Sequence, residues 1–351
     1  MAIDENKLQE LMGRMLGDVG AAMGTALVLL GDKFGYYKTL ATEGPMTSAE
    51  LASKTGTVER YVREWAAGQA AAGYINYDAG SGRFSMSPEQ ALLLADENGP
   101  AFFPGMFEIA AAAIRDEPKV ANAFQHGGGV GWHEHDACLF RGTERFFRPG
   151  YAMHLVSEWI PALDGVREKL ERGARVADVG CGHGASVILM AKAFPKSKFF
   201  GFDYHQPSID RARERAREAG VSDRATFERA TAKDYPGTYD LVAFFDCLHD
   251  MGDPVGAAAH VKSSLARDGT WMLVEPFANE RLEDNLNPIG RVFYAASTTI
   301  CVPGSLSQEV GLGLGTQAGE SRLREVLKAG GFTRVRRATA TPFNLVLEAR
   351  A

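Results

Sequence analysis

A glycine-rich segment near the middle of the chain has the residue types of a ligand-binding turn. In VADVGCGHGASV, Asp178 precedes three glycines at alternate positions, Gly180, Gly182 and Gly184. Glycines after a strand let a ligand approach the backbone closely, and phosphate is a common ligand because the N-terminus of the following helix attracts anions. The carboxylate of Asp178 would repel a phosphate. We therefore expect a ligand that carries positive charge at this turn.

A second acidic residue, Asp203, ends the next apolar run, FFGFD. A carboxylate in this position can accept hydrogen bonds from both hydroxyls of a ribose. S-adenosylmethionine would satisfy both acids, because it has an ammonium group, a sulfonium and a ribose but no phosphate. The competing ligand is a dinucleotide, since Gly180, Gly182 and Ala185 also fit the pattern G-x-G-x-x-G/A. That alternative would make the protein a nicotinamide oxidoreductase.

These motifs resemble those of the class I S-adenosylmethionine-dependent methyltransferases. VADVGCGHG is similar to their first motif and FFGFD to their ribose motif, while FNLVLEAR is similar to their antiparallel last strand. The resemblance covers about 175–351 and implies S-adenosylmethionine as cofactor and S-adenosylhomocysteine as product. The cofactor-binding residues taken from this comparison are Asp178, Gly180, Cys181, Gly182, Asp203, Tyr204, Thr231, Ala232 and Asp246.

One of these positions departs from the family. The family has an acidic residue after the third strand that accepts the adenine amine, and Thr231 occupies the matching position in ERATAKDYP. Its hydroxyl and the N–H of Ala232 are the groups that could contact adenine here. Tyr204 could stack on the base or serve as an ordinary aromatic residue at a strand end.

The segment FFDCLHDMGDP resembles the part of small-molecule O-methyltransferases that carries the catalytic base, which is here His249, followed by Asp250. A neutral imidazole can accept a phenolic proton near pH 7. Glu275 ends the following strand, in LVEP, and its carboxylate is expected to approach His249. The alternative for His249 is a loop histidine that caps a helix or lines the pocket.

The glycine-rich segment HGGGVGWHEHDACLF contains His126, His133 and His135. A metal site is one interpretation of the H-x-H pair, but no second ligand pair accompanies it at helical or hairpin spacing, so we predict no metal. We expect the segment to line the acceptor pocket or to fold over the cofactor. The residues assigned to this region are Trp132, His133, Phe140, Arg145, Phe146, Phe147 and Tyr151.

The elements that would position these groups follow from the apolar pattern after residue 175. Short apolar runs alternate with amphipathic helices, which predicts an α/β fold with a mainly parallel sheet. The short link at 340–342 makes the last two strands antiparallel. Strands are predicted at 175–180, 197–203, 225–230, 239–246, 270–276, 333–339 and 344–350, and helices at 185–194, 207–219, 255–266 and 321–329. The prediction is thus a seven-stranded Rossmann-like methyltransferase sheet with an antiparallel last strand.

The N-terminal part is predicted to be mainly helical and to contain a winged helix. Apolar residues recur at helical spacing over 8–40, and helix, turn, helix and a glycine-tipped hairpin follow over 47–87. Residues 43–97 hold four basic and eight acidic side chains, a net charge of −4 that disfavours DNA. We expect a dimerisation module, as in dimeric O-methyltransferases with this layout. The alternative is a DNA-binding transcriptional regulator that binds S-adenosylmethionine.

The domain boundaries we expect are 1–98 for the helical and winged-helix part, 99–170 for a helical linker and lid, and 171–351 for the methyltransferase domain. Within the last, residues 279–317 form an insertion at the carboxyl end of the fifth strand, where open α/β sheets bind ligands. This insertion could cover a substrate.

The overall composition limits the kinds of partner and cellular compartment that we expect for this protein. The 351 residues are 45% hydrophobic and carry a net charge of −6, which disfavours nucleic-acid and anionic-membrane partners. The four cysteines lie far apart, so we expect a reducing cytoplasm. The most apolar early run, 19–30, is too short to span a bilayer. The function predicted is a cytoplasmic, homodimeric methyltransferase that acts on a hydroxyl of a small, apolar or aromatic molecule.

Overall fold

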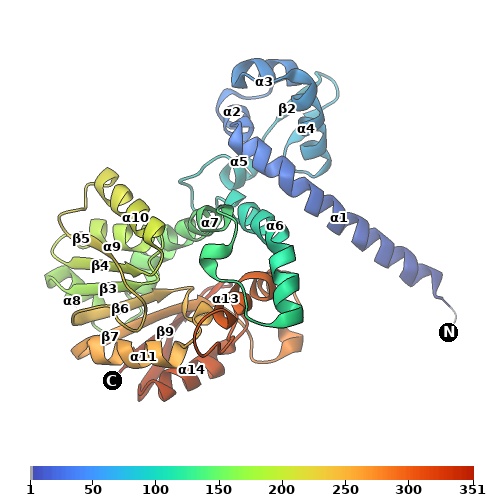
Figure 1. Ribbon diagram of the computed structural model, residues 1–351. Coiled ribbons are helices and arrows are strands. Elements are labelled where there is room, and N and C mark those ends of the chain that lie inside the picture. Colours follow the sequence, from blue (N-terminus) through green and yellow to red (C-terminus); the bar gives the residue numbers. More distant parts are fainter. Residues whose placement is uncertain (1–2) are drawn as a thin grey trace. The chain divides into compact units, whose positions relative to one another are not determined.

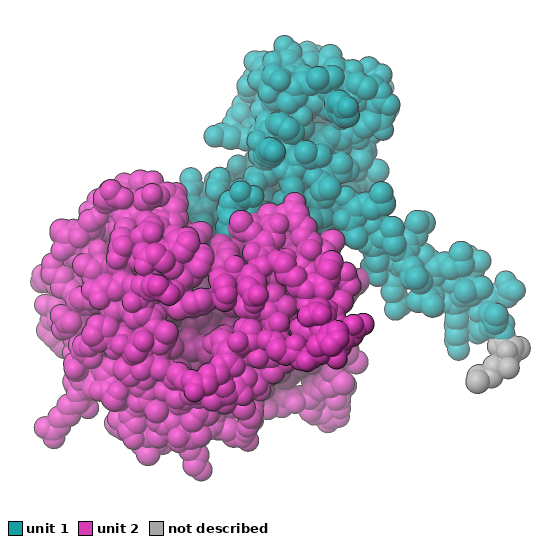
Figure 2. Space-filling model, viewed as in Figure 1, with its two compact units in different colours: residues 1–111, 141–149 teal, residues 112–140, 150–351 magenta. Residues whose placement is uncertain are grey.

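The computed structural model describes residues 3–351 and divides into two compact units, which are coloured separately in Figure 2. Unit 1 comprises the described residues up to Ala111 together with Arg141–Pro149. Unit 2 comprises Ala112–Phe140 and Gly150–Ala351, and the face of it that Figure 2 shows is hollowed.

Unit 1 contains the predicted winged helix. The Thr47–Glu50 capping box starts the first of its two helices, and Gly56, with φ of +65°, ends it in a left-handed cap. A short antiparallel hairpin follows the second helix. The buried hydrophobic core of unit 1 includes Tyr37 and Trp65. The elements are α1 (Glu5–Lys33), α2 (Tyr36–Glu43), α3 (Ser48–Thr55), α4 (Glu59–Ala71), β1 (Asn76–Asp78), β2 (Arg83–Ser85) and α5 (Pro88–Leu94).

Helix α1 is longer than the apolar run that marks it in the sequence. It is continuous over 29 residues, and only its C-terminal part buries residues, which are Thr25, Val28 and Gly31. The N-terminal part extends away from the rest of unit 1 (Figure 1). By length and composition alone, α1 is the one described helix that could cross a bilayer, whereas the sequence run 19–30 is too short. Arg14 and Asp18 lie within it.

Two helices link the units, α6 (Pro104–His126) and α7 (Cys138–His154), with the short 3-10 turn η1 (Trp132–Glu134) between them. A π-helical turn, η2 (Leu155–Trp159), continues α7, and α8 (Val166–Arg172) precedes the sheet.

Unit 2 is built on one seven-stranded sheet in the order β5-β4-β3-β6-β7-β9-β8 (Figure 1). Strands β3 to β7 are parallel, and β9 is antiparallel to both of its neighbours. This confirms the predicted fold class. The strands are β3 (Arg175–Val179), β4 (Lys198–Asp203), β5 (Ala225–Arg229), β6 (Tyr239–Phe245), β7 (Leu265–Pro276), β8 (Arg334–Ala340) and β9 (Asn344–Arg350).

Strand β7 differs from the prediction because it begins at Leu265 rather than at residue 270. Leu265 pairs with Tyr239 before an irregularity in the register, so the polar residues before Thr270 extend the strand. The preceding helix correspondingly ends at Ser264. A polar, charged run gives no strand signal by itself.

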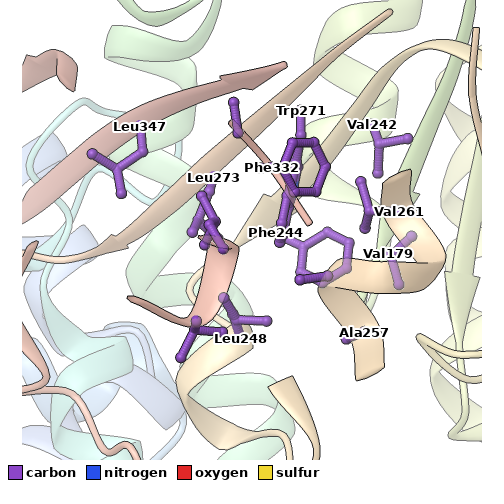
Figure 3. Packing of buried hydrophobic residues seen from close by; sticks show 14 of the residues in the cluster. Val179, Val242, Phe244, Leu248, Ala257, Val261, Trp271, Leu273, Phe332 and Leu347 are labelled. Carbon is purple, nitrogen blue, oxygen red and sulfur yellow. The ribbon is translucent and has the colours of Figure 1, made fainter. Parts of the chain in front are cut away.

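Buried hydrophobic residues hold the sheet against its helices. Trp271, Phe244 and Phe332 form one aromatic group within this core, and Val261 packs beside them (Figure 3). The helices of this part are α9 (Ala185–Ala193), α10 (Gln206–Glu218), α11 (Pro254–Ser264) and α14 (Gly319–Ala329). Because β6 is buried along nearly its whole length, its carboxyl end holds a fixed position.

The insertion after β7 is mostly helical. It contains η4 (Leu282–Asn285), α12 (Pro288–Ala296), a π-helical turn η5 (Ser297–Cys301) and α13 (Val302–Leu306). Hydrogen bonds tie it to the 3-10 turn η3 (Leu248–Asp250) that follows β6: the Ser305 hydroxyl donates to the Met251 carbonyl at 2.8 Å, and the Gln308 amide donates to the Asp250 carbonyl at 2.8 Å. The insertion therefore lies beside the carboxyl end of the sheet.

Candidate active site

The glycine turn between β3 and α9 uses its own backbone donors internally. The N–H groups of Gly180 and Cys181 donate to the Phe202 carbonyl at 2.8 and 3.0 Å, and that of Gly184 donates to the Cys181 carbonyl at 2.9 Å. The Gly182 N–H donates to Asp203 at 2.9 Å. A turn whose N–H groups are engaged in this way has few donors left to hold a diphosphate.

Glycine is required at the first position of this turn. Gly180 has φ of +76°, and a Cβ atom there would lie 2.8 Å from the sulfur of Cys247. Cys247 follows β6, so the close approach brings the turn against the strand that leads to η3. Gly182, with φ of +50°, has no atom within 4 Å of its Cβ position, so this part of the turn has room for a ligand.

Asp178 lies under the turn with one carboxylate oxygen unused. Its Oδ2 accepts a hydrogen bond from the Ser186 hydroxyl. Its Oδ1 is buried and has no partner among the residues of the described chain. Burial, and to a lesser degree the charge of Asp203, raise the pKa of Asp178 to about 7 against the Ser186 hydrogen bond. A cationic group beside Oδ1 would satisfy this oxygen and favour the ionised form.

Asp203 ends β4 and holds the two segments around it. Its Oδ2 accepts the Gly182 N–H, and its Oδ1 accepts the His205 N–H at 2.9 Å. Burial raises its pKa, while these two hydrogen bonds lower it. Each oxygen retains a further lone pair, which fits the ribose role predicted for this residue.

Aromatic side chains gather beside Asp203. Phe140 stacks on His205 with 4.4 Å between ring centroids, and His133 approaches Tyr204 edge-on at 6.3 Å. Tyr204 is more than one-third exposed. The segment between α6 and α7 thus contacts the residues after β4.

The groups of Thr231 that are predicted to contact adenine take part in local hydrogen bonds. The Thr231 hydroxyl accepts the Lys233 N–H at 3.3 Å, and the Thr231 N–H donates to Asp234 at 2.6 Å. These bonds form a tight turn after β5. The hydroxyl keeps an acceptor lone pair, and Ala232 is half-buried in the same turn.

Asp246 follows β6 in a left-handed conformation, with φ of +50°. Its carboxylate accepts hydrogen bonds from Tyr151 at 3.1 Å and from Asn344 at 2.8 Å. Burial and the charge of Glu275 raise its pKa to about 8. Residues with strained backbones are concentrated at functional sites, so this conformation is consistent with the predicted role.

His249 and Glu275 come together as the sequence predicts. His249 Nδ1 lies 2.5 Å from Glu275 Oε2, and the other oxygen, Oε1, accepts the Leu248 N–H at 2.9 Å. His249 Nε2 lies 3.2 Å from Asp250 Oδ1. Burial would lower the pKa of His249, but the two carboxylates outweigh it and raise that pKa well above its ordinary value.

The three histidines of the loop have separate surroundings. His135 Nδ1 lies 2.9 Å from the buried carboxylate of Asp116, and His126 Nδ1 lies 3.1 Å from the Asn122 carbonyl, while His133 approaches Tyr204. Among residues 3–351, the group of side chains with the spacing of metal ligands is instead His249, Asp250 and Cys301.

No sequence motif assigns a role to several side chains of this region. Asp116 orients His135, Asn344 bonds Asp246, and Cys301 approaches His249 and Asp250. Trp132, which the sequence does indicate, lies close enough to Asp250 to help lower the pKa of its carboxyl against the effect of burial. Asn344 lies in FNLVLEAR, which marks a strand but gives this side chain no role. Asp116 and Cys301 lie outside the motifs, so only their polar or thiol chemistry could have marked them.

Three residues assigned to the pocket region, Arg145, Phe146 and Phe147, belong to unit 1. The guanidinium of Arg145 pairs with Asp32 at 2.7 Å and with Glu108 at 2.5 Å. Phe146 approaches Phe103 edge-on at 6.0 Å. Arg145 therefore neutralises the buried carboxylate of Glu108 and the half-buried carboxylate of Asp32 within its own unit. Tyr151, by contrast, belongs to unit 2 and reaches Asp246.

Comparison with known families gives two matches in this chain. Residues 170–327 match the family described as methyltransferase domain, and residues 21–96 match the family described as Rv2258c-like winged HTH domain. The first contains the glycine turn, Asp203, His249, Glu275 and Cys301, and the second contains the helices and hairpin of the winged helix.

Similar sequences match over short stretches. A polyketide synthase, ThaQ, of Burkholderia thailandensis is 34% identical over 117 residues, and the 27-O-demethylrifamycin SV methyltransferase of Amycolatopsis mediterranei is 37% identical over 87 residues. These stretches cover 33% and 24% of this chain, but only 6% and 32% of the two relatives.

Similar solved structures extend over the whole chain. Mitomycin 7-O-methyltransferase matches with a TM-score of 0.70 at 21% identity and covers 99% of this chain and 100% of its own. Human N-acetylserotonin methyltransferase, solved in complex with S-adenosylmethionine, matches with a TM-score of 0.73 at 15% identity, with 100% and 99% covered. At these identities the likeness shows a common fold.

Proposed function

We propose that this chain, which carries a methyltransferase domain at residues 170–327, transfers the methyl group of S-adenosylmethionine to a hydroxyl of a small apolar or aromatic molecule. The observation that carries the choice of cofactor is the glycine turn, whose N–H groups are internally bonded above a buried carboxylate with an unused oxygen. This arrangement favours a cationic amino-acid group over a diphosphate.

Named residues would hold the cofactor as follows. Asp178 Oδ1 would face the ammonium group, directly or through water, and Asp203 would accept the ribose hydroxyls. Tyr204, Thr231 and Ala232 would surround the adenine. The bound cofactor supplies an already activated methyl group, so the protein's remaining tasks are to align the acceptor and to remove its proton.

The proton-accepting atom would be His249 Nε2. Glu275 bonds Nδ1 and so fixes the ring and the tautomer with a proton on Nδ1. After Nε2 takes the proton of the acceptor hydroxyl, the imidazolium lies between Glu275 and Asp250, and both carboxylates stabilise it. His249 can begin a cycle only in its neutral form. Because the pKa of His249 is raised, this form becomes abundant at higher pH than for an ordinary histidine.

The acceptor is proposed to be small and apolar because of the side chains that converge near Asp250. Trp132 contacts Phe140 edge-on, with ring centroids 5.9 Å apart, and it lies beside Asp250. The Cβ position of Gly304, in α13, lies 3.2 Å from Trp132, so the insertion packs against the same indole. We propose that this insertion covers the acceptor.

The cofactor is tested by calorimetry on the full chain. We expect S-adenosylmethionine and S-adenosylhomocysteine to bind at micromolar concentration and the nicotinamide dinucleotides not to bind. Binding of a nicotinamide dinucleotide in place of S-adenosylhomocysteine would overturn the proposal. A panel of phenols, with an amine and a carbon acceptor of similar shape, then tests which atom is methylated.

The proposed assembly is a homodimer formed through α1. Large apolar side chains of this helix are exposed at positions 8, 11, 12, 15, 16, 19 and 23, a spacing that places them along one stripe. A second copy of the helix would cover this stripe with a matching one. We also propose a cytoplasmic location, since all four cysteines are free thiols.

The DNA-binding alternative draws on the match to a winged HTH domain. The four basic residues of the winged helix, however, are each within 2.8 Å of a carboxylate of the same unit: Lys54 with Glu43, Arg60 with Glu64, Arg63 with Glu59 and Arg83 with Glu50. DNA phosphates would have to displace these carboxylates. Tight, sequence-specific shifts of genomic fragments at physiological salt would favour the regulator.

A further inference from the structure

Three donor atoms of different chemistry converge beside the proposed base. A ring nitrogen of His249, a carboxylate oxygen of Asp250 and Cys301 Sγ all lie within 4.8 Å of one another, and His249 Nε2 lies 3.2 Å from Asp250 Oδ1. The three residues are 3%, 8% and 6% exposed. They come from two segments, because His249 and Asp250 belong to η3 after β6, whereas Cys301 ends the π-helical turn η5 of the insertion.

The surroundings of these atoms resemble the outer shell of a metal site. The other ring nitrogen of His249 is held by the Glu275 carboxylate at 2.5 Å, as metal-binding histidines usually are. Asp250 Oδ1 is buried and accepts no hydrogen bond in the described part of the chain, although Nε2 is 3.2 Å away. Two atoms that approach one another without a directed hydrogen bond are placed as ligands of a common cation would be.

The two segments are also held in register by the backbone. The Gly315 N–H donates to the His249 carbonyl at 3.3 Å, and Gln308 bonds both the Gly252 N–H and the Asp250 carbonyl. These bonds fix the insertion to η3 on both sides of Asp250. Cys301 is therefore held in position next to His249 without any ion.

We propose that His249 Nε2, Asp250 Oδ1 and Cys301 Sγ bind one divalent cation of the Zn²⁺ class. A nitrogen, a carboxylate oxygen and a thiolate form a donor set that suits zinc, and three protein ligands leave a fourth position open. Magnesium and calcium prefer oxygen donors and would bind poorly. On binding, the Cys301 thiol releases its proton to solvent, as does Nε2 of His249 where that nitrogen is protonated, and His249 binds as the neutral ring with its Nδ1 proton directed at Glu275.

The bound ion would compete with catalysis, and this step rests on the proposed function. The lone pair of His249 Nε2 that would accept the proton of the substrate hydroxyl is the same lone pair that the metal would occupy. Zinc therefore inhibits methyl transfer, and a chelator restores it. The site would make turnover sensitive to free zinc.

The binding step is tested with Co²⁺, which reports a thiolate ligand through a sulfur-to-metal charge-transfer band. Co²⁺ is titrated into chelator-treated full-length protein without cofactor or acceptor, so the result does not depend on the enzyme's being active. We expect the band in the wild type, its loss in Cys301→Ser, and its retention in Cys138→Ser, the matched control with a half-buried free thiol elsewhere in unit 2.

Absence of the band in the wild type, or its persistence in Cys301→Ser, would overturn the proposal. Far-ultraviolet circular dichroism checks that the variants fold. If Cys301→Ser does not fold, Asp250→Asn serves as the second variant, with an expected loss of at least tenfold in Zn²⁺ affinity by calorimetry. Unchanged affinity in a folded Asp250→Asn protein contradicts the ligand set.

The inhibitory step has its own readout. Each protein is compared with its own metal-free rate, and the half-inhibitory Zn²⁺ concentration is expected to rise at least tenfold in Cys301→Ser but not in Cys138→Ser. Equal zinc sensitivity of both variants would overturn the inhibitory step. If no acceptor is methylated at all, the proposed function fails, while the Co²⁺ spectrum still decides the metal site.

Discussion

His249 Nδ1 and Glu275 Oε2 lie 2.5 Å apart at the carboxyl ends of the neighbouring strands β6 and β7. Both side chains are buried, and the second oxygen of Glu275 is held by the backbone N–H of Leu248. The carboxylate is therefore positioned independently of the imidazole that it orients. A histidine held in this way presents Nε2 in a defined direction, which is the geometric requirement for a general base.

Replacement of His249 by alanine should remove proton transfer while keeping cofactor binding. We expect kcat to fall by about 10²- to 10⁴-fold, the usual contribution of a general base. The dissociation constant for S-adenosylhomocysteine should change little. Turnover of a phenolic acceptor gives kcat, and calorimetry gives the dissociation constant. The control is His126→Ala, which replaces an exposed histidine of the same unit. Unchanged turnover would make His249 part of the pocket wall.

Glu275→Gln should have a smaller effect on the same reaction. The amide keeps the shape of the side chain but loses the charge that stabilises the imidazolium, so we expect kcat to fall about 10- to 100-fold, as for other residues that orient a functional histidine. KM for the acceptor should stay nearly constant. A change confined to KM would instead assign Glu275 to acceptor binding.

Cofactor affinity should depend on pH through Asp178. Its pKa in the free protein is raised to about 7, and a bound ammonium group favours the carboxylate, so binding releases a proton below that pH. The dissociation constant of S-adenosylhomocysteine should therefore decrease as pH rises towards about 7, by at most roughly tenfold per pH unit. Calorimetry in two buffers of different ionisation enthalpy measures the proton released. Asp178→Asn should bind S-adenosylhomocysteine more weakly and lose the pH dependence of its affinity. A wild-type affinity that does not change with pH would contradict the prediction.

Asp178 should also destabilise the cofactor-free protein at neutral pH. The native state holds the proton of Asp178 up to about pH 7, whereas the unfolded chain releases it near pH 4, so stability falls between these values as pH rises. Asp178→Asn should raise the free energy of unfolding at pH 8 by up to about 4 kcal/mol and leave it nearly unchanged at pH 4. Denaturant unfolding at both values checks this. The exposed Asp210→Asn is the control, and a loss of stability at pH 8 in Asp178→Asn would refute the explanation.

Charges placed on the apolar stripe of α1 should separate the proposed dimer. Leu16 and Met23 are 76% and 73% exposed in the single chain, so Leu16→Glu with Met23→Glu should leave its fold intact. Size-exclusion chromatography with light scattering should give a dimer for the wild type and a monomer for the double variant. Leu282→Glu, an exposed apolar residue of unit 2, should remain dimeric. A monomeric wild type would rule out this interface.

Much of the fold could be predicted because its signals are local. The strands around Val176, Leu241 and Leu347 are continuous apolar runs, and the Thr47–Glu50 capping box is a pattern of four residues. The start of β7 was not predictable in this way, since the pairing of Leu265 with Tyr239 depends on a neighbouring strand. Similarly, the 29-residue length of α1 exceeds its apolar run.

The sequence by itself determined the ligand chemistry and the positions of the strand ends. Asp178, Asp203, His249 and Glu275 each follow or end an apolar run, and parallel strands bring such positions to one edge of a sheet. Only the tertiary structure decided what else reaches that edge. Cys301 and Trp132 lie about fifty or more residues from His249 along the chain, and their approach depends on how the insertion and the loop before α7 pack. Contacts between distant segments leave no periodic pattern in the sequence, so no local pattern could have predicted them.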